Sequence, residues 1–205
     1  MSELQTTPFP RRDAGWIAVR LHDGGQAELR PLGRGDTAPL LRVFEDMSEN
    51  SRALRYLTGL PRLPRQMLNM LADVDGDRHV AWVASADGEP AGIARYVRVP
   101  GCPTTAEVAF EVVDRHHGRG LGTVLLDTIT TVAAAHGVRS VQATVAPSNA
   151  TSRRMLGRLG LSLRPVDGLL EAEGPLRLMD PPVVDRGAVV RAACLGAGDE
   201  ALDIG

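Results

Sequence analysis

The residues best suited to chemistry lie between positions 106 and 126, where two carboxylates precede a run of alternate glycines. The glycines are Gly118, Gly120 and Gly122, and without Cβ atoms they let the backbone lie flat against a phosphate. The following residues have the apolar spacing of a helix, so the positive end of a helix dipole should lie at the same point. The pattern predicts a binding site for the phosphates of a nucleotide-type cofactor. A side chain at Gly120 is expected to collide with a bound phosphate while leaving the fold largely intact.

Glu107 and Glu111 lie on the predicted strand that leads into this turn. Side chains alternate along a strand, so two glutamates four positions apart share a face. A carboxylate can act as the general base that takes a proton from an attacking amine. Because Val108, Phe110 and Val112 already supply the core face, we expect at least one glutamate to face the reacting groups.

Two common phosphate-binding motifs do not fit this turn. The chain contains no lysine, whereas the ATP- and GTP-binding loop ends in Gly-Lys-Ser/Thr. A dinucleotide fingerprint needs a glycine where Thr123 stands, and an acidic residue at the end of the next strand, where residues 146–149 read Ala-Pro-Ser-Asn. The sequence therefore excludes both of these cofactor classes.

Residues 117–122, His-Gly-Arg-Gly-Leu-Gly, resemble the acyl-coenzyme A loop of the GNAT N-acetyltransferase superfamily, Arg/Gln-x-x-Gly-x-Gly/Ala. His117 replaces the usual Arg or Gln. A strand, Asn149 and a helix ending at Gly160 follow at spacings similar to those of the superfamily. The likeness covers roughly residues 16–178. Four segments are similar to the bacterial protein-lysine acetyltransferase (Pat-like) branch: 28–32, 48–56, 92–96 and 106–110.

The resemblance implies an acyltransferase that binds acetyl-coenzyme A (acetyl-CoA) between two splayed parallel strands. One backbone N–H of the strand would polarise the thioester carbonyl and stabilise the oxyanion. Asn149 would contact the coenzyme arm, and it is equally suited to cap the following helix, so both roles stay open. The implied coenzyme contacts are Val112, Val113, His117, Gly118, Arg119, Gly120, Leu121, Gly122, Thr123 and Asn149.

Of the two glutamates, Glu107 is the favoured base. Four residues at about 3.3 Å each place the two roughly 13 Å apart, too far for both to reach one amine. Glu111 lies close to the turn and the cofactor arm, whereas Glu107 lies where an acceptor can approach, and the resemblance places the base there too. Leu156 stands where many members of the superfamily have a tyrosine that protonates the leaving thiolate, and Ser152 is nearby.

The expected reaction is direct acetyl transfer from acetyl-CoA to an amine, with a protein lysine as the favoured acceptor. One alternative is acetylation of a small amine such as an aminoglycoside or polyamine. The other is a non-catalytic acyl-CoA-binding sensor module, which the departures at His117 and Leu156 favour and the intact Glu107 disfavours. We expect a monomer or homodimer, and the sequence does not choose between them.

Composition adds few constraints. The net charge of −2 gives no indication of nucleic-acid binding, and no apolar segment reaches the length needed to span a membrane. The N-terminus lacks a basic start and an apolar run, so no signal peptide and a cytoplasmic location are expected.

The cysteines Cys102 and Cys194 and the pair His116 and His117 lack metal-ligand spacing, so no metal is expected. Cys102 has no neighbouring His or Asp motif that would make it an acyl-carrying nucleophile.

The expected fold is α+β, a mixed and mostly antiparallel sheet flanked by helices, with one crossover helix that makes a parallel strand pair. Residues 1–14 are expected to be disordered, 15–178 to form the acetyltransferase domain, and 179–205 to form a tail. Within the tail, 187–195 reads as a short helix that caps the domain or docks on a partner, and disorder is an equal alternative. Expected strands lie at 16–22, 26–32, 80–85, 91–99, 107–113, 138–146, 161–164 and 169–178, and expected helices at 36–48, 51–57, 65–72, 120–136 and 149–159.

Overall fold

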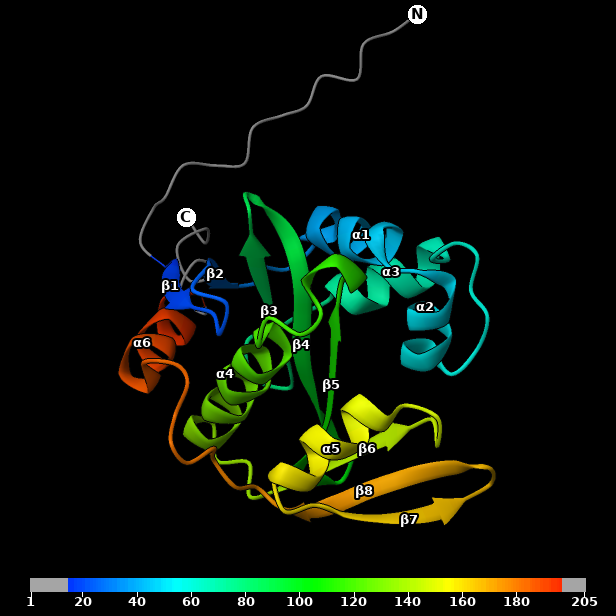
Figure 1. Cartoon of the computed structure of the whole chain (residues 1–205). Coiled ribbons are helices and arrows are strands. Elements are labelled where there is room, and N and C mark those ends of the chain that lie inside the picture. Colours follow the sequence, from blue (N-terminus) through cyan, green and yellow to red (C-terminus); the bar gives the residue numbers. More distant parts are fainter. Residues whose placement is uncertain (1–14, 197–205) are drawn as a thin grey trace, which may run out of the picture.

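The computed structural model describes residues 15–196. The segment expected to be disordered, 1–14, and the end of the expected tail, 197–205, lie outside the described residues. A mixed sheet in the order β1-β2-β3-β4-β5-β6-β8-β7 runs through the domain (Figure 1). Its strands are β1 (Ile17–Arg20), β2 (Gln26–Pro31), β3 (His79–Ala86), β4 (Glu89–Val99), β5 (Cys102–Val112), β6 (Ser140–Val145), β7 (Ser162–Val166) and β8 (Leu169–Pro175).

One strand pair differs from the rest of the sheet. Neighbouring strands are antiparallel throughout, except for β5 and β6, which are parallel. Pairing between β5 and β6 ends at Glu107 and Gln142, although β5 continues to Val112 and β6 to Val145. The two strands therefore splay apart toward their carboxyl ends. The predicted α+β fold, with its splayed parallel pair, is confirmed.

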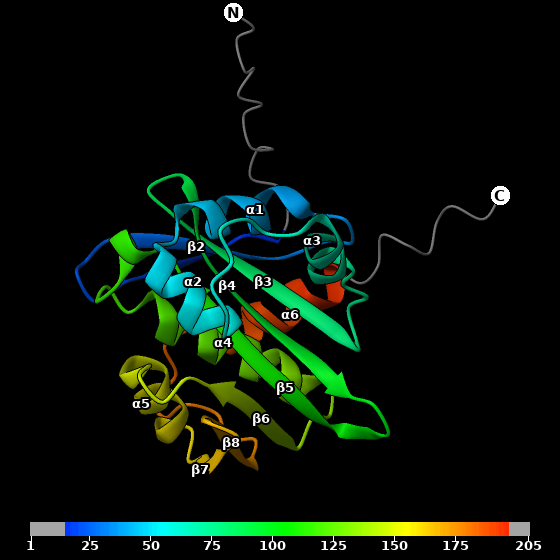
Figure 2. The ribbon, with the colours of Figure 1, turned by 90° about the vertical axis from the view of Figure 1, so that its right-hand side faces the viewer.

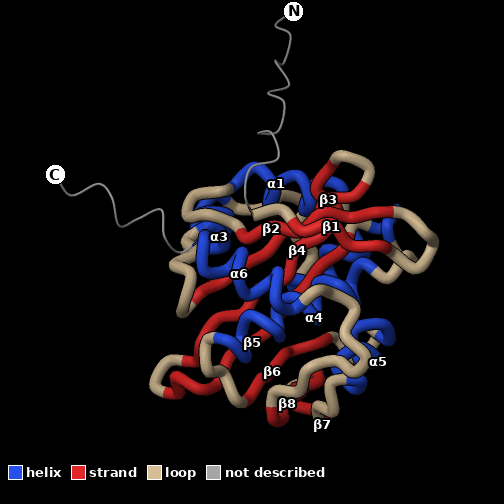
Figure 3. The backbone as a smooth tube through the Cα atoms, turned by 90° about the vertical axis from the view of Figure 1, so that its left-hand side faces the viewer, coloured by secondary structure: helices blue, strands red, loops and turns tan. Residues whose placement is uncertain are grey.

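Helices cover both faces of the sheet. Figure 2 shows α1, α2 and α3 on one side, and Figure 3 shows α4 and α6 on the opposite side. The core is accordingly split in two, with Trp82 and Tyr96 in the cluster under α4 and Val83 and Ile93 in the cluster under α1 and α3. The helices are α1 (Thr37–Asp46), α2 (Glu49–Tyr56), α3 (Arg65–Ala72), α4 (Leu121–Ala135), α5 (Ala150–Arg158) and α6 (Arg186–Gly196), with a short 3₁₀ turn η1 (Asp114–His116).

The segment that follows residue 178 packs onto the domain. Val184 and Val189 belong to the core cluster under α4, and α6 contacts α4 and β2. Asp127 of α4 is fully buried, and its carboxylate accepts hydrogen bonds from the backbone N–H of Val183 at 2.8 Å and from Arg186 at 3.1 Å. Of the alternatives open for this segment, the structure shows the helix that caps the domain.

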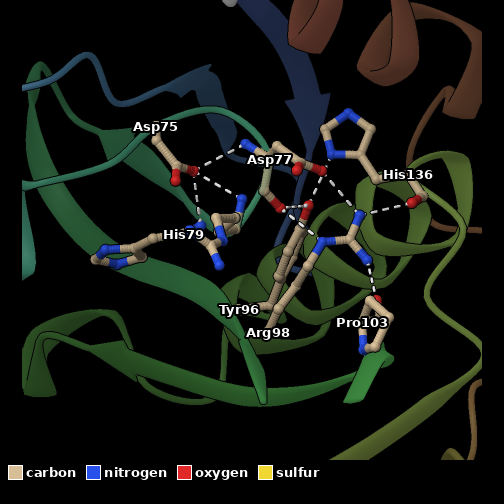
Figure 4. Close-up of polar contacts among 8 residues, drawn as sticks. Asp75, Asp77, His79, Tyr96, Arg98, Pro103 and His136 are labelled. Atoms are coloured by element: carbon tan, nitrogen blue, oxygen red, sulfur yellow. Dashed lines mark hydrogen bonds and ion pairs between the residues drawn. The ribbon is translucent and has the colours of Figure 1, made fainter. Parts of the chain in front are cut away.

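A polar cluster ties the sheet together at the end of α4 away from the glycine turn (Figure 4). Arg98 of β4 donates to the side chain of Asp77 at 2.9 Å and to the backbone carbonyl of His136 at 2.7 Å, and it also bonds the carbonyl of Pro103. The Tyr96 hydroxyl lies 2.7 Å from Nδ1 of His136. These bonds fix the carboxyl end of α4 relative to β3, β4 and β5, and so help to set where its amino end lies.

Candidate active site

The two glutamates share a face of β5 but have different surroundings. Ala106 and Val108 point into the core under α4, so Glu107 and Glu111 lie on the opposite face. Glu107 is exposed, whereas the side chain of Glu111 is only 2% exposed. The two glutamates share a face, as the strand period predicts. They differ in that the Glu107 carboxylate is open to solvent and the Glu111 carboxylate is buried.

Glu111 is the counterion of Arg55. Its Oε2 accepts a hydrogen bond from Nε of Arg55 on α2. Burial lowers the pKa of Arg55, but the charge and hydrogen bond of Glu111, together with Tyr56 and Glu107, outweigh burial and raise the pKa above its ordinary value. The buried guanidinium of Arg95 on β4 also lies within the field of Glu111, and burial lowers its pKa. Glu111 is therefore committed to an ion pair inside the protein, whereas Glu107 is open to an acceptor.

The glycine turn has the backbone geometry of an anion site. Gly118 and Gly120 have φ values of 77° and 92°, and Gly120 is the N-cap of α4. The first N–H groups of a helix have no acceptor within the helix and point toward its amino end. A Cβ on Gly120 would lie 3.1 Å from the ring of His22. A side chain at Gly120 would therefore strain the turn itself, so the expectation that it would leave the fold largely intact is not supported.

The side chains of Arg119 and His117 in the turn are bonded within the protein. Arg119 donates to Asp23 at 2.6 Å and to Asp87 at 2.9 Å. His117 donates from Nε2 to the carbonyl of Val112 at 2.8 Å. These contacts fix the turn against the β1–β2 and β3–β4 turns. They leave the backbone N–H groups, rather than the side chains of Arg119 and His117, to face a bound phosphate.

Backbone pairing distinguishes Val112 from Val113. Val113 donates its N–H to the carbonyl of Ala91 at 2.9 Å. Hydrogen-bonded and non-hydrogen-bonded pairs alternate along an antiparallel ladder, so the N–H of Val112, which is opposite Gly92, points away from β4 and into the splayed gap. Val112 is therefore the better placed of the two to hold an acyl carbonyl.

A cavity of about 910 Å³ connects the gap, the glycine turn and the face that carries the glutamates. Its lining includes every expected site residue except Val113 and Arg119. An apolar wall from α1, α2 and α3, which the sequence did not assign to a site, also lines the cavity. That wall comprises Met47, Leu54, Tyr56, Leu57, Met67, Met70 and Leu71. In the structure the wall is recognisable because Leu57 and Met70 are large apolar side chains exposed to solvent. Exposure cannot be read from the sequence, so the wall was not predicted.

On the α5 side of the cavity, the structure shows the helix-cap role that was expected of Asn149. Its Oδ1 accepts the N–H of Ser152 at 3.0 Å, so it caps α5, and it also lines the cavity. Leu156 is buried and Met155 lies against the start of α4, where a Cβ on Gly122 would be 3.2 Å from Cε of Met155. No tyrosine hydroxyl stands at position 156 to protonate a thiolate.

Other chemistries have little support in the described part of the chain. Residues 15–196 contain no group of three His, Cys, Asp or Glu side chains placed to hold a metal ion. Within the same residues, no helix is both long enough and apolar enough to cross a membrane. Cys102 is exposed at the start of β5, ten residues from Val112, which places it roughly 33 Å away along the strand.

Comparison with known proteins identifies the family. Residues 43–161 match the acetyltransferase (GNAT) family, and the chain belongs to it. It therefore has the acyltransferase fold of a family that uses acetyl-CoA as the acyl donor.

Individual relatives refine the likeness. "Acetyltransferase Pat" of Mycolicibacterium smegmatis is 33% identical over 146 residues, which make up 70% of this chain and 44% of that protein. "Acetyltransferase PA5475" of Pseudomonas aeruginosa is 29% identical over 150 residues, covering 71% of this chain and 79% of that protein. The crystal structure of the GNAT domain of S. lividans PAT matches with a TM-score of 0.73 and 32% identity, covering 78% of this chain and 97% of that domain. This chain thus spans less than half of the Mycolicibacterium relative.

Proposed function

We propose that this chain transfers the acetyl group of acetyl-CoA directly to the side-chain amine of a protein lysine, with Glu107 as the general base. The observation that carries the proposal is the shared cavity that holds Glu107, the inward N–H of Val112 and the amide groups of the glycine turn. The likeness to Pat acetyltransferases supports a protein lysine over a small amine.

Each group has a task that its position allows. The α4 amino end and the glycine-turn amides bind the pyrophosphate, and the Val112 N–H stabilises the negative charge that develops on the acyl oxygen. Glu107 accepts the proton of the attacking ammonium, directly or through a water, since a protonated amine cannot attack a carbonyl. The tetrahedral adduct then collapses: the C–S bond breaks, the nitrogen gives its second proton to water, and the departing thiolate takes a proton from water.

Glu107 suits this task because it is exposed, whereas Glu111 is bonded to Arg55. Cys102 is remote from the splayed gap, which favours direct transfer over an acetyl-cysteine intermediate. Incubation with acetyl-CoA alone should therefore leave the mass of the protein unchanged. A stoichiometric acetyl adduct on Cys102 would replace direct transfer with a two-step route.

An acceptor screen tests the proposal. The protein is incubated with acetyl-CoA and lysine-containing peptides, a polyamine or an aminoglycoside, and both free thiol and acceptor mass are followed. We expect acetylation of peptide lysines at rates well above those of the small amines. Preferential acetylation of a small amine would change the acceptor class, and binding of acetyl-CoA without transfer to any amine would favour the sensor module.

A further inference from the structure

The coenzyme brings more negative charge than the glycine turn can neutralise. A pyrophosphate carries two negative charges, and a phosphate monoester such as the 3′-phosphate of coenzyme A carries about −1.5 to −2 at pH 7. The side chain of Arg119 is bonded to Asp23 and Asp87, and His117 is bonded to the Val112 carbonyl. The turn therefore offers backbone dipoles but no uncommitted guanidinium.

Three arginines line the cavity, and one of them is already paired. Arg55 is the partner of Glu111. Arg154 and Arg158 line the α5 side, and neither has a hydrogen-bond or ion-pair partner among residues 15–196. They are four residues apart on α5, so they lie one turn apart on the same side of the helix.

The position of α5 puts this pair near the phosphate end of the cavity. Met155, the residue after Arg154, packs against Gly122 in the first turn of α4. Arg154 and Arg158 therefore line the cavity from a helix that packs against the end of α4 that would hold the pyrophosphate. Guanidinium groups bind phosphate oxygens through charge-assisted and often bidentate hydrogen bonds.

We infer that Arg154 and Arg158 form a binding site for the 3′-phosphate monoester of coenzyme A. The inference rests on the proposed donor, acetyl-CoA, and adds a determinant of donor choice. The pair selects donors that carry the 3′-phosphate over otherwise identical pantetheine thioesters that lack it.

The test compares the dissociation constants of coenzyme A and 3′-dephospho-coenzyme A, measured by titration calorimetry on the full chain. The wild type should bind coenzyme A about tenfold more tightly, as expected for two partly exposed ion pairs with a dianion. The double variant Arg154→Gln, Arg158→Gln should lose this preference and bind both ligands as the wild type binds the dephospho form. Higher salt should reduce the wild-type preference as well.

Arg153 supplies a matched control on the same helix. It donates to the Pro147 carbonyl at 3.0 Å, and it lines a second hollow beside Leu163 and Leu170, which it shares with Arg154, but it does not line the main cavity. Arg153→Gln should keep the wild-type preference. The charge-retaining double variant Arg154→Lys, Arg158→Lys should keep part of it, which separates loss of charge from damage to α5.

Three results would overturn the inference: equal binding of both ligands by the wild type, an unchanged preference in the double Gln variant, or an equal loss of affinity for both ligands in that variant. In each case coenzyme binding itself survives, so the proposed acetyl transfer stands. If the wild type binds neither ligand, the proposed donor fails together with this site.

Discussion

Glu107 and Glu111 are the same residue type on the same face of one strand, yet the fold gives them different partners. The shared face follows from the strand period, so the sequence predicts it. The pairing of Glu111 with Arg55 spans 56 positions, and no local pattern reveals it. Local periodicity therefore predicts both candidate bases. Only long-range packing shows that Glu111 is held in an ion pair, whereas Glu107 is exposed to solvent.

Glu111→Gln should lower the free energy of unfolding on the order of 2–4 kcal/mol, because it leaves the largely buried guanidinium of Arg55 without its counterion. Urea denaturation at pH 7 measures the change. The exposed Glu107→Gln is the matched control and should shift stability by less than about 0.5 kcal/mol. Equal stability of the two variants would mean that Glu111 does not act as a counterion.

Gly122→Val should prevent coenzyme binding with little strain, since Gly122 has an ordinary helical backbone and only the flexible end of Met155 must move. The same change at Gly120 should lower stability, because φ there is 92° and His22 lies in the way. At 100 times its dissociation constant, acetyl-CoA should stabilise the wild type by about 2.7 kcal/mol. Thermal unfolding should show this stabilisation by acetyl-CoA in the wild type and not in Gly122→Val. Equal stabilisation of the variant would mean that the phosphates bind away from Gly122.

At the scale of elements, α2 depends on polar contacts. No residue of α2 is fully buried. Asp114 accepts the N–H of Ser48 at 2.8 Å and the hydroxyls of Ser48 and Ser51 at 2.7 Å each. Burial raises the pKa of Asp114, but these hydrogen bonds outweigh it and hold the pKa below its ordinary value. The helix α2, which contributes to the apolar wall of the cavity, is thus tied to the segment next to the glycine turn.

Asp114→Ala should loosen α2, with a local loss of about 0.5–2 kcal/mol, typical of removing a helix cap. Hydrogen exchange should speed up in residues 49–56 and stay unchanged in α4. The Michaelis constant for the acceptor should rise more than the dissociation constant of acetyl-CoA. Unchanged exchange in α2 would show that the helix is held by other contacts.

The capping helix α6 is the subject of a second prediction at this scale. Removal of residues 179–205 uncovers the apolar surface of α4 and removes the partners of Asp127, and a buried valine contributes about 1.5–3 kcal/mol. This truncation should lower the unfolding free energy by roughly 3 kcal/mol or more. Removal of 197–205 alone keeps α6 and serves as the control. If the shorter chain is as stable as the control, the domain ends near 178, as the sequence suggests.

For the whole molecule, histidine burial predicts the pH dependence of stability. Burial lowers the pKa values of His79, His116 and His136 below the ordinary value. The folded state then binds fewer protons than the unfolded state, so stability is fully present above about pH 6.5 and falls as the pH decreases through that value. Asp75 and Asp114, with lowered pKa values, add a further loss below about pH 4.

Urea denaturation at pH 7.5, 6.5 and 5.5 should show decreasing free energies of unfolding. His136→Gln should flatten this dependence, because it removes one of the three groups that take up protons on unfolding. A wild-type stability that rises toward pH 5.5 would contradict the prediction, because the folded state would then bind more protons than the unfolded state.

The fold as a whole was more predictable than the contacts within it. Alternating and helical apolar spacing is local, so the strands and helices from residue 16 to 178 were expected near where they lie. The partners of Arg119, which come from two other turns, were not predictable. For residues 187–195 the sequence left a capping helix, a docking helix and disorder open, and Asp127, a polar residue in an apolar helix, is a sign that α4 receives a further segment.

Glu107 is central to the proposed reaction, because it takes the proton of the acceptor amine. Turnover of the wild type, Glu107→Gln and Glu111→Gln should be measured from pH 7 to pH 10 with saturating acetyl-CoA and a lysine peptide. Glu107→Gln should lose about 10²-fold or more at pH 7, with acetyl-CoA binding nearly unchanged, and should recover in part as the amine loses its proton at high pH. If Glu107→Gln keeps full activity at pH 7 while correctly folded Glu111→Gln loses it, the base is Glu111 and the proposed mechanism is contradicted.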